Sequence, residues 1–380
     1  MPSIDSLVGV AESLKKRPLL VDSERCVVVR HRQAKCRACV DACMAGALAV
    51  SAGELRFNPS KCVGCGACAV VCPTEALQST QPPEDNLIAA AQSQAQTCGR
   101  SVFACARVCA NERVDAAKVC EVSCLARVDE AAVVSAAAAG AQTVLLVDGN
   151  CSTCKFRATE PLIEDVVSCS QAFLDAAESS AIVERDCVIP EDALLTEDEE
   201  ANQTGSSRRN FLSDAVAQAR DITKSATEAA LAQELGNKGA ASTIEFGHNP
   251  CEEGAFPTFT MPRRDALVNA LFELGIPDSA TIESLSFGNV SIVTDVCNGC
   301  GVCAFFCPTG ALRRDKPEES RTKSRFLEFN ASECVQCGLC VNVCWKRACQ
   351  LSPSVPASQL FDFDPVVFRL DAGKSSNPAV

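Results

Sequence analysis

The most informative stretch of the chain is CNGCGVCAFFC, residues 297–307, which places cysteines at positions 297, 300, 303 and 307. The first three are spaced three residues apart, so their thiolates come from one tight loop and can hold three corners of an iron–sulfur cubane. The fourth cysteine is expected to begin a short helix that leads away from the loop. The spacing therefore predicts an iron–sulfur motif.

With Pro308 directly after it, this run resembles the motif of bacterial two-cluster ferredoxins. In that family the fourth cysteine serves the neighbouring cluster, so the resemblance implies that the motif occurs in pairs. The same spacing recurs at Cys334, Cys337, Cys340 and Cys344, and again at Cys62, Cys65, Cys68 and Cys72. An altered copy precedes the motif that begins at Cys62, and it comprises Cys26, Cys36, Cys39 and Cys43.

The resemblance also implies which cysteines share a cluster, and it predicts four [4Fe-4S] clusters. Tetrad A comprises Cys26, Cys36, Cys39 and Cys72. Tetrad B comprises Cys62, Cys65, Cys68 and Cys43. Tetrad C comprises Cys297, Cys300, Cys303 and Cys344. Tetrad D comprises Cys334, Cys337, Cys340 and Cys307.

The altered copy departs from the family pattern. Nine residues separate Cys26 from Cys36, and Met44 stands where the proline is expected. Cys26 is a ligand if the enlarged loop lets it reach, and a three-iron cluster is the alternative if it does not. Two zinc sites are another interpretation, since CxxC pairs suit tetrahedral zinc. Zinc does not require the third CxxC step or the trailing Cys-Pro, so iron–sulfur chemistry is favoured.

Composition narrows the class of protein. The chain has 380 residues and a formal net charge of −13, which argues against nucleic acid as a partner. Its 27 cysteines would also suit a disulfide scaffold, but such scaffolds are usually short and follow a signal peptide, and we expect neither here. We therefore expect a reducing, cytoplasmic location. The uncharged run over residues 131–147 is alanine-rich and too short for a transmembrane segment.

The middle of the chain is predicted to form a small parallel α/β domain. A helix is expected over residues 84–96, and strands over residues 101–105, 117–122 and 143–147. A helix over residues 129–139 joins the last two strands, which predicts a parallel pair with a right-handed crossover. Ligands of such sheets bind beyond the carboxyl ends of the strands. The cysteines at or just past these ends are Cys105, Cys124, Cys151 and Cys154.

Two segments here, CLARVDE at residues 124–130 and GNCSTCKF at residues 149–156, resemble the small delta subunit of methyl-viologen-reducing hydrogenases. The resemblance implies a [2Fe-2S] centre that passes electrons to heterodisulfide reductase. The spacing of Cys151 and Cys154 is tighter than is usual in that family, and Cys109 is a candidate to replace any of the four. The alternative interpretation is that these cysteines are packing residues, since free cysteine is often buried as a small apolar side chain.

Smaller elements are predicted around the motifs. Residues 27–29 are expected to form a strand, residues 47–50 and 55–57 a hairpin, and helices are expected just after Cys43 and Cys72. Strands over residues 290–294 and 326–329 should precede the two C-terminal motifs. An acidic connector should carry a surface helix from about residue 207 to 235 and a second helix over residues 263–274. A charged insertion between residues 312 and 326 is either a partner contact or a solvated loop.

We therefore predict an α+β chain, with two ferredoxin-like 2[4Fe-4S] domains flanking a small parallel α/β domain and a connector of linker and helices. The predicted bounds are 1–82 for the first ferredoxin-like domain, 83–190 for the α/β domain, 191–285 for the connector and 286–352 for the second ferredoxin-like domain. A tail without a regular element is expected over 353–380.

Three functions are weighed. The first is an electron-transfer subunit, without catalytic residues of its own, that serves a catalytic oxidoreductase such as a hydrogenase, a formate dehydrogenase, a heterodisulfide-reductase-like enzyme or a flavoprotein. The second is a reductase that acts on a disulfide or another sulfur substrate at the middle cysteines. The third is a non-redox metal scaffold, which the ferredoxin spacing argues against. Cysteine spacing alone does not identify the partner, since the same relay serves many oxidoreductases.

Overall fold

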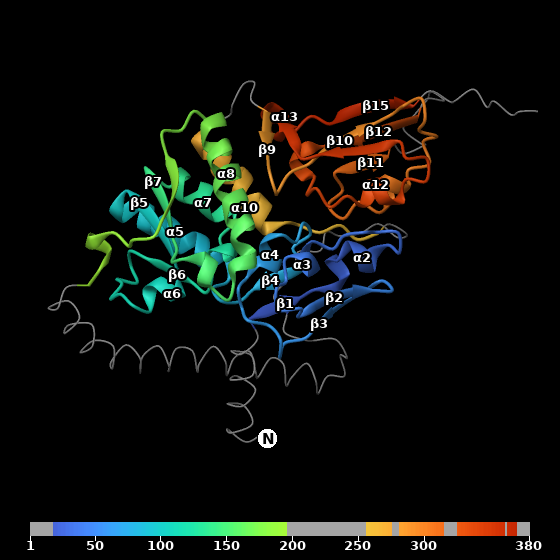
Figure 1. Cartoon of the computed structure of the whole chain (residues 1–380). Helices are drawn as coiled ribbons and strands as arrows, with labels where there is room; N and C mark the ends of the chain where they lie inside the picture. Colours follow the sequence, from blue (N-terminus) through green and yellow to red (C-terminus); the bar gives the residue numbers. More distant parts are fainter. Residues whose placement is uncertain (1–17, 196–255, 276–280, 315–324, 362, 371–380) are drawn as a thin grey trace, which may run out of the picture.

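The computed structural model describes residues 18–195, 256–275, 281–314, 325–361 and 363–370. They form an N-terminal module, a central α/β domain and a C-terminal module. Figure 1 shows the N-terminal module (blue) and the C-terminal module (orange to red) next to each other, both alongside the α/β domain (green). The predicted surface helix from residue 207 and most of the charged insertion lie outside the described residues.

The N-terminal module has the paired plan predicted for a ferredoxin-like domain. Strand β1 (Leu19–Val21) pairs antiparallel with β4 (Leu77–Ser79), and β2 (Leu48–Ser51) pairs antiparallel with β3 (Glu54–Phe57). The predicted hairpin is therefore confirmed. Its two-residue turn has φ values of 53° at Ala52 and 78° at Gly53, as the tight turns of twisted hairpins require.

Two local predictions in this module are wrong. Residues 27–29 belong to a helical turn, α2 (Val27–Arg30), in which the N–H of Arg30 donates to the carbonyl of Cys26 at 2.9 Å. Valine favours strands, but the side chains of Val27 and Val28 are also buried when these residues form a helical turn. The helices α3 (Ala38–Asp41) and α4 (Ala67–Val70) precede Cys43 and Cys72 instead of following them.

The α/β domain is a four-stranded parallel sheet in the order β6-β5-β7-β8. Its strands are β5 (Arg100–Cys105), β6 (Cys120–Val122), β7 (Thr143–Val147) and β8 (Ile182–Asp186). The three predicted strands are present. However, β5 lies between β6 and β7, so the two strands joined by the predicted crossover are parallel but not neighbours. Strand β8 and helix α8 (Glu160–Ala176) were not predicted.

Helices cover one face of this sheet. Phe103, Val144 and Leu146 point into the core shared with α5 (Glu84–Cys98), α7 (Glu130–Ala138) and α8, while the alternate residues Val102 and Leu145 belong to a smaller core on the other face. Helix α7 is buried from residue 130 to residue 137. This burial explains why the run of residues in α7 is rich in alanine. No helix among the described residues has the length and apolar character needed to span a bilayer.

The C-terminal module repeats the plan with additions. Strand β10 (Asn289–Ile292) pairs with β13 (Cys349–Ser352), and β11 (Leu312–Arg314), β12 (Arg325–Phe329) and β15 (Val366–Leu370) form a three-stranded sheet. The short helices α11 (Val302–Phe305) and α12 (Leu339–Val343) each follow a glycine. The two predicted strands are thus present, as β10 and β12.

The tail prediction is wrong. Beyond residue 353 the chain forms β14 (Ser354–Pro356), α13 (Ala357–Phe361) and β15. Strand β14 pairs with β9 (Thr281–Glu283), which comes from the predicted connector. The tail therefore completes the C-terminal module by pairing with strands that are distant in the sequence. Such pairings cannot be predicted from the local sequence of the tail.

Helix α10 (Pro262–Leu274) joins the three parts and confirms the helix predicted over residues 263–274. It packs against α7, and its first turn carries Arg263 and Arg264. Arg263 donates to the carbonyl oxygens of Ala69 and Cys72 at 2.6 and 2.9 Å, and Arg264 Nη1 donates to that of Glu333 at 2.9 Å. A single buried apolar core runs through all three parts.

Candidate iron–sulfur sites

Three of the four tetrads each line one cavity. The cysteines of tetrad A line a cavity with Val28, Leu55 and Leu77. Those of tetrad B line a second cavity, and those of tetrad D line a third. The structure thus brings together twelve of the predicted ligands in the predicted groups of four, and it places Cys26 with tetrad A despite its enlarged loop.

The thiols within these cavities oppose one another's ionisation. Burial raises the pKa of Cys39 to about 12, and the neighbouring thiols Cys72, Cys36 and Cys26 add to the rise. Burial likewise raises the pKa of Cys340, with Cys337, Cys334 and Cys307 adding to it. Four buried or half-buried sulfurs that repel one another as anions need a cationic centre between them, so these residues fit an iron–sulfur cluster.

Tetrad C is more open. Burial raises the pKa of Cys297, and the thiols of Cys303, Cys344 and Cys300 raise it further. Cys300 is exposed. Sequence analysis did not single out Cys349, whose buried thiol hydrogen-bonds to Cys303 and thereby lowers the pKa of Cys303. Strand β13 carries Cys349, and its pairing with β10 directs the thiol to this site.

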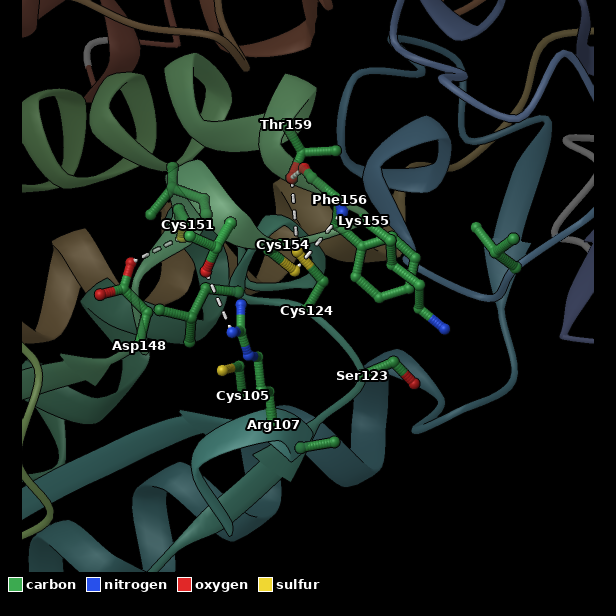
Figure 2. A pocket seen from close by; sticks show the side chains of 15 residues that line it. Cys105, Arg107, Ser123, Cys124, Asp148, Cys151, Cys154, Lys155, Phe156 and Thr159 are labelled. Carbon is green, nitrogen blue, oxygen red and sulfur yellow. Dashed lines mark hydrogen bonds between the residues drawn. The ribbon is translucent and has the colours of Figure 1, made fainter. Parts of the chain in front are cut away.

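The four predicted middle cysteines also converge. Cys105, Cys124, Cys151 and Cys154 line a cavity of about 580 Å³ beyond the carboxyl ends of the parallel strands (Figure 2). Cys124 Sγ lies 3.3 Å from Thr159 Oγ1, and Cys154 Sγ accepts from the N–H of Phe156 at 3.4 Å. Cys109 belongs instead to the smaller core beneath the sheet and does not line this cavity.

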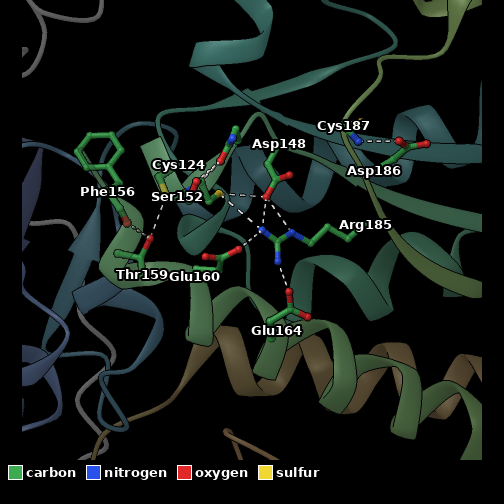
Figure 3. Close-up of polar contacts among 12 residues, drawn as sticks. Cys124, Asp148, Ser152, Phe156, Thr159, Glu160, Glu164, Arg185, Asp186 and Cys187 are labelled. Carbon is green, nitrogen blue, oxygen red and sulfur yellow. Dashed lines mark hydrogen bonds and ion pairs between the residues drawn. The ribbon is translucent and has the colours of Figure 1, made fainter. Parts of the chain in front are cut away.

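Cys151 lies beside Asp148 (Figure 2), and Asp148 in turn pairs with Arg185 (Figure 3). Its thiol donates to Asp148 Oδ2 at 3.2 Å, and burial together with this carboxylate raises the pKa of Cys151 to about 12. Arg185 Nε donates to the same Oδ2 at 2.8 Å, and Arg185 also pairs with Glu160 and Glu164. Sequence analysis missed Arg185 because it did not predict β8.

The middle cavity adjoins tetrad B. Val63, between Cys62 and Cys65, lines both this cavity and that of tetrad B. Arg127, three residues after Cys124, is buried against Gly66, where an added Cβ would come within 2.6 Å of Arg127 Cδ. Burial raises the pKa of Cys65, and among the thiols Cys124 contributes most to the rise. The middle cysteines and tetrad B are therefore neighbours.

The other tetrads continue the row. Burial raises the pKa of Cys68 in tetrad B, and Cys39 of tetrad A is among the thiols that raise it further. Burial also raises the pKa of Cys337 in tetrad D, and Cys36 of tetrad A is among the thiols that raise it further. Cys303 contributes in the same way to the raised pKa of Cys340. These mutual effects indicate the order middle cavity, tetrad B, tetrad A, tetrad D, tetrad C. Arg30, four residues after Cys26, bonds to the carbonyls of Phe306 and Cys307, so the two modules meet between tetrads A and D.

Comparison with known proteins agrees with this geometry. Residues 296–348 match the 4Fe-4S dicluster domain family, and residues 55–78 match the 4Fe-4S binding domain family. Over 75 residues the chain is 36% identical to a ferredoxin of Mycolicibacterium smegmatis, a match that covers 20% of this chain and 66% of that ferredoxin. The class defined by fold and site is that of iron–sulfur electron-transfer proteins. Within it, this chain carries 4Fe-4S ferredoxin-type domains near both ends, and the α/β domain lies outside the residues that the two family models match.

Proposed function

We propose that the chain is a polyferredoxin-type electron-transfer subunit. In this proposal tetrads A to D hold four [4Fe-4S] clusters that relay low-potential electrons to or from a catalytic oxidoreductase partner. The middle cysteines hold a fifth, [2Fe-2S] centre. The observation that carries the proposal is the series of cysteine groups through both modules and the α/β domain, in which tetrads A, B and D and the middle cysteines each line a cavity.

The bound clusters would supply one-electron transfer, and the protein's part is to hold them close together and tune them. The cysteine sulfurs fix each cluster, and the apolar residues around tetrads A, B and D limit its contact with water. Arg30, Arg263 and Arg264 bond to backbone carbonyls beside the cysteine loops and keep the modules in register. Nothing in this role requires a catalytic side chain of the chain's own.

The partner belongs, in this proposal, to the oxidoreductases that use a separate iron–sulfur subunit, such as hydrogenases, formate dehydrogenases, heterodisulfide-reductase-like enzymes or flavoproteins. The resemblance of the middle segments to the hydrogenase delta subunit favours a role in this group. Tetrads A to D supply four of the five centres, so removal of the middle centre should shorten the row without disrupting the rest.

A second function is favoured by the size of the middle cavity. Its volume of about 580 Å³ lies in the range of small-molecule sites, and Arg107 and Lys155 line it beside the cysteines. A reductase acting on a disulfide or another sulfur substrate would bind that substrate here. Turnover of such a substrate by the purified chain with a chemical reductant and no partner protein would favour this function over the first.

Iron and acid-labile sulfide analysis of anaerobically purified protein tests the proposal. Four cubanes give about sixteen irons, and a two-iron middle centre raises the total to about eighteen. Cys124→Ser should remove about two irons and the corresponding EPR signal. Cys120→Ser is the matched control, because Cys120 is buried on β6 but does not line the cavity. Zinc without labile sulfide would refute the proposal, and equal iron in wild type and Cys124→Ser would refute the middle centre.

A further inference from the structure

Tetrad C ends the row, and it is the tetrad nearest to solvent. Cys300 is exposed, whereas the other cysteines of the four tetrads are buried or half-buried. Arg314 lies across the adjoining loop, where its Nη1 is 3.4 Å from the carbonyl oxygen of Cys300. An end of the row that reaches solvent is where a protein outside the chain can approach it.

Four exposed apolar side chains stand on the segments that carry this site. They are Val293, Val296, Val341 and Trp345, whose exposed fractions are 36%, 45%, 37% and 64%. Val296 directly precedes Cys297, Trp345 directly follows Cys344, and the N–H of Val293 donates to the carbonyl of Ala348 at 2.9 Å, which ties the two segments together. We call these four residues the valine–tryptophan surface.

The exposure of the tryptophan indicates a use. Trp345 is the chain's one tryptophan, and it stands mostly in water instead of in a core. Exposed apolar groups that gather at one place usually mark a binding surface, and tryptophan is among the residues that contribute most to protein–protein binding. A site directly beside Cys297 and Cys344 brings any bound protein next to tetrad C.

The charges around the surface indicate the kind of partner. Arg314, Lys346 and Arg347 are exposed there, with Lys346 Nζ 4.3 Å from the centre of the Trp345 ring, and Asp295 is the carboxylate in the adjoining turn. The chain as a whole carries a formal net charge of −13. Among the described side chains, this end therefore carries three exposed cations and one carboxylate on a chain that is acidic as a whole, so these side chains attract a negatively charged face and disfavour a positive one.

We infer that the valine–tryptophan surface and its rim of Arg314, Lys346 and Arg347 dock a small acidic electron-transfer protein. The inference rests on the proposed function and adds the chemistry of one partner and the place where it binds. The apolar residues supply the contact next to tetrad C, and the cations orient the acidic partner as it approaches.

Binding of an acidic flavodoxin in its oxidised form tests the inference, with the full, cluster-loaded chain and isothermal titration calorimetry. Wild-type affinity should fall as salt is raised. The double substitution Lys346→Glu with Arg347→Glu should weaken binding by about tenfold or more, and Trp345→Ala by about tenfold. The matched control is Arg56→Glu on β3, a site 66% exposed in the other module, which should bind as wild type does.

Four outcomes overturn the inference. They are no binding of flavodoxin to the wild type, unchanged binding by the double variant, an equal loss in Arg56→Glu, and self-association of the wild type that Trp345→Ala abolishes. The last would assign the surface to a second copy of the chain. Iron and sulfide analysis of each variant separates these outcomes from failure of the proposed function, since that failure would appear as missing clusters in the wild type.

Discussion

Arg30 Nη2 lies 3.2 Å from the carbonyl oxygen of Cys307, although the two residues are 277 positions apart. Arg30 Nε also donates to the carbonyl of Phe306 at 2.8 Å, and the guanidinium lies 4.7 Å from the centre of the Phe256 ring. One side chain that follows Cys26 by four residues thus holds the loop that carries Cys307. The contact fixes tetrads A and D to each other across the two modules.

Replacement of Arg30 by alanine should therefore loosen the modules. The carbonyls of Phe306 and Cys307 would lose a charged donor, and we expect the free energy of unfolding to fall by about 2–4 kcal/mol. Denaturant unfolding of the cluster-loaded protein measures this change. Arg32→Ala is the control, since Arg32 is exposed two residues further on, and it should change stability by less than about 0.5 kcal/mol. Equal stability of both variants would show that the contact does not hold the modules.

Gly66 is predicted to be intolerant of any side chain. Its φ is +83°, and a Cβ would lie 2.6 Å from Arg127 Cδ and 2.8 Å from Arg127 Cβ. Gly66→Ala should therefore cost the left-handed backbone strain of about 1 kcal/mol and a further 1–3 kcal/mol for overpacking against a buried side chain. A thermal melt of the holoprotein measures the sum.

Gly46 supplies the comparison for this prediction. Its φ is +59°, but no atom lies within 4 Å of an added Cβ. Gly46→Ala should show the backbone cost alone. A melting temperature equally low for both variants would mean that Arg127 moves aside freely and that the contact between the α/β domain and tetrad B is loose.

Cys344 and Cys349 are predicted to differ in role although both lie near Cys303. Cys344→Ala should remove about four irons, because it takes one ligand from tetrad C. Cys349→Ala should keep them, because its thiol is a hydrogen-bond partner of Cys303 and not a member of the tetrad. Iron analysis and EPR of the two variants decide the matter, and loss of a cluster from Cys349→Ala would reassign the ligand.

Sequence spacing predicts the cysteine groups well because each motif is local. In tetrads B, C and D three of the cysteines come from one loop of seven residues, so their approach depends only on the backbone of that loop, whereas Cys26 of tetrad A reaches its group across an enlarged loop. The fourth comes from the paired motif, as the ferredoxin resemblance implies. The four middle cysteines converge for a similar reason, since the carboxyl ends of parallel strands meet at one edge of a sheet.

The arrangement of the modules could not be predicted in this way. The order β6-β5-β7-β8, the pairing of β9 with β14 and the position of Cys349 depend on contacts between distant segments. The short run Val27–Val29 was misjudged because β-branched residues favour a strand only where a neighbouring strand is available. Arg30 and Arg185 carry no local signal of their roles, which arise from the partners that the fold brings to them.

The stability of the protein should fall as the pH rises from about 5 to 8, in part because of Glu84. Burial raises the pKa of Glu84 to about 8, and Asp129 adds to the rise, against the lowering effect of Arg127 at 3.0 Å. The folded state therefore holds this proton more tightly than the unfolded chain, in which the carboxyl titrates near about 4.3. The stability that this raised pKa contributes is fully present below the pKa of the unfolded chain, and it is lost as the pH rises toward the pKa of the folded state.

Glu84→Gln should remove this part of the pH dependence, because glutamine keeps the shape of the protonated acid without its titration. One proton gives a slope of at most about 1.4 kcal/mol per pH unit, and the effect should be smaller here because 26% of the Glu84 side chain is exposed. Urea unfolding of the holoprotein at several pH values between 5 and 8 measures the slope. Asp85→Asn, at the exposed neighbouring position, should leave the slope unchanged. A slope as steep in Glu84→Gln as in the wild type would show that other groups, and not this buried carboxyl, set the pH dependence.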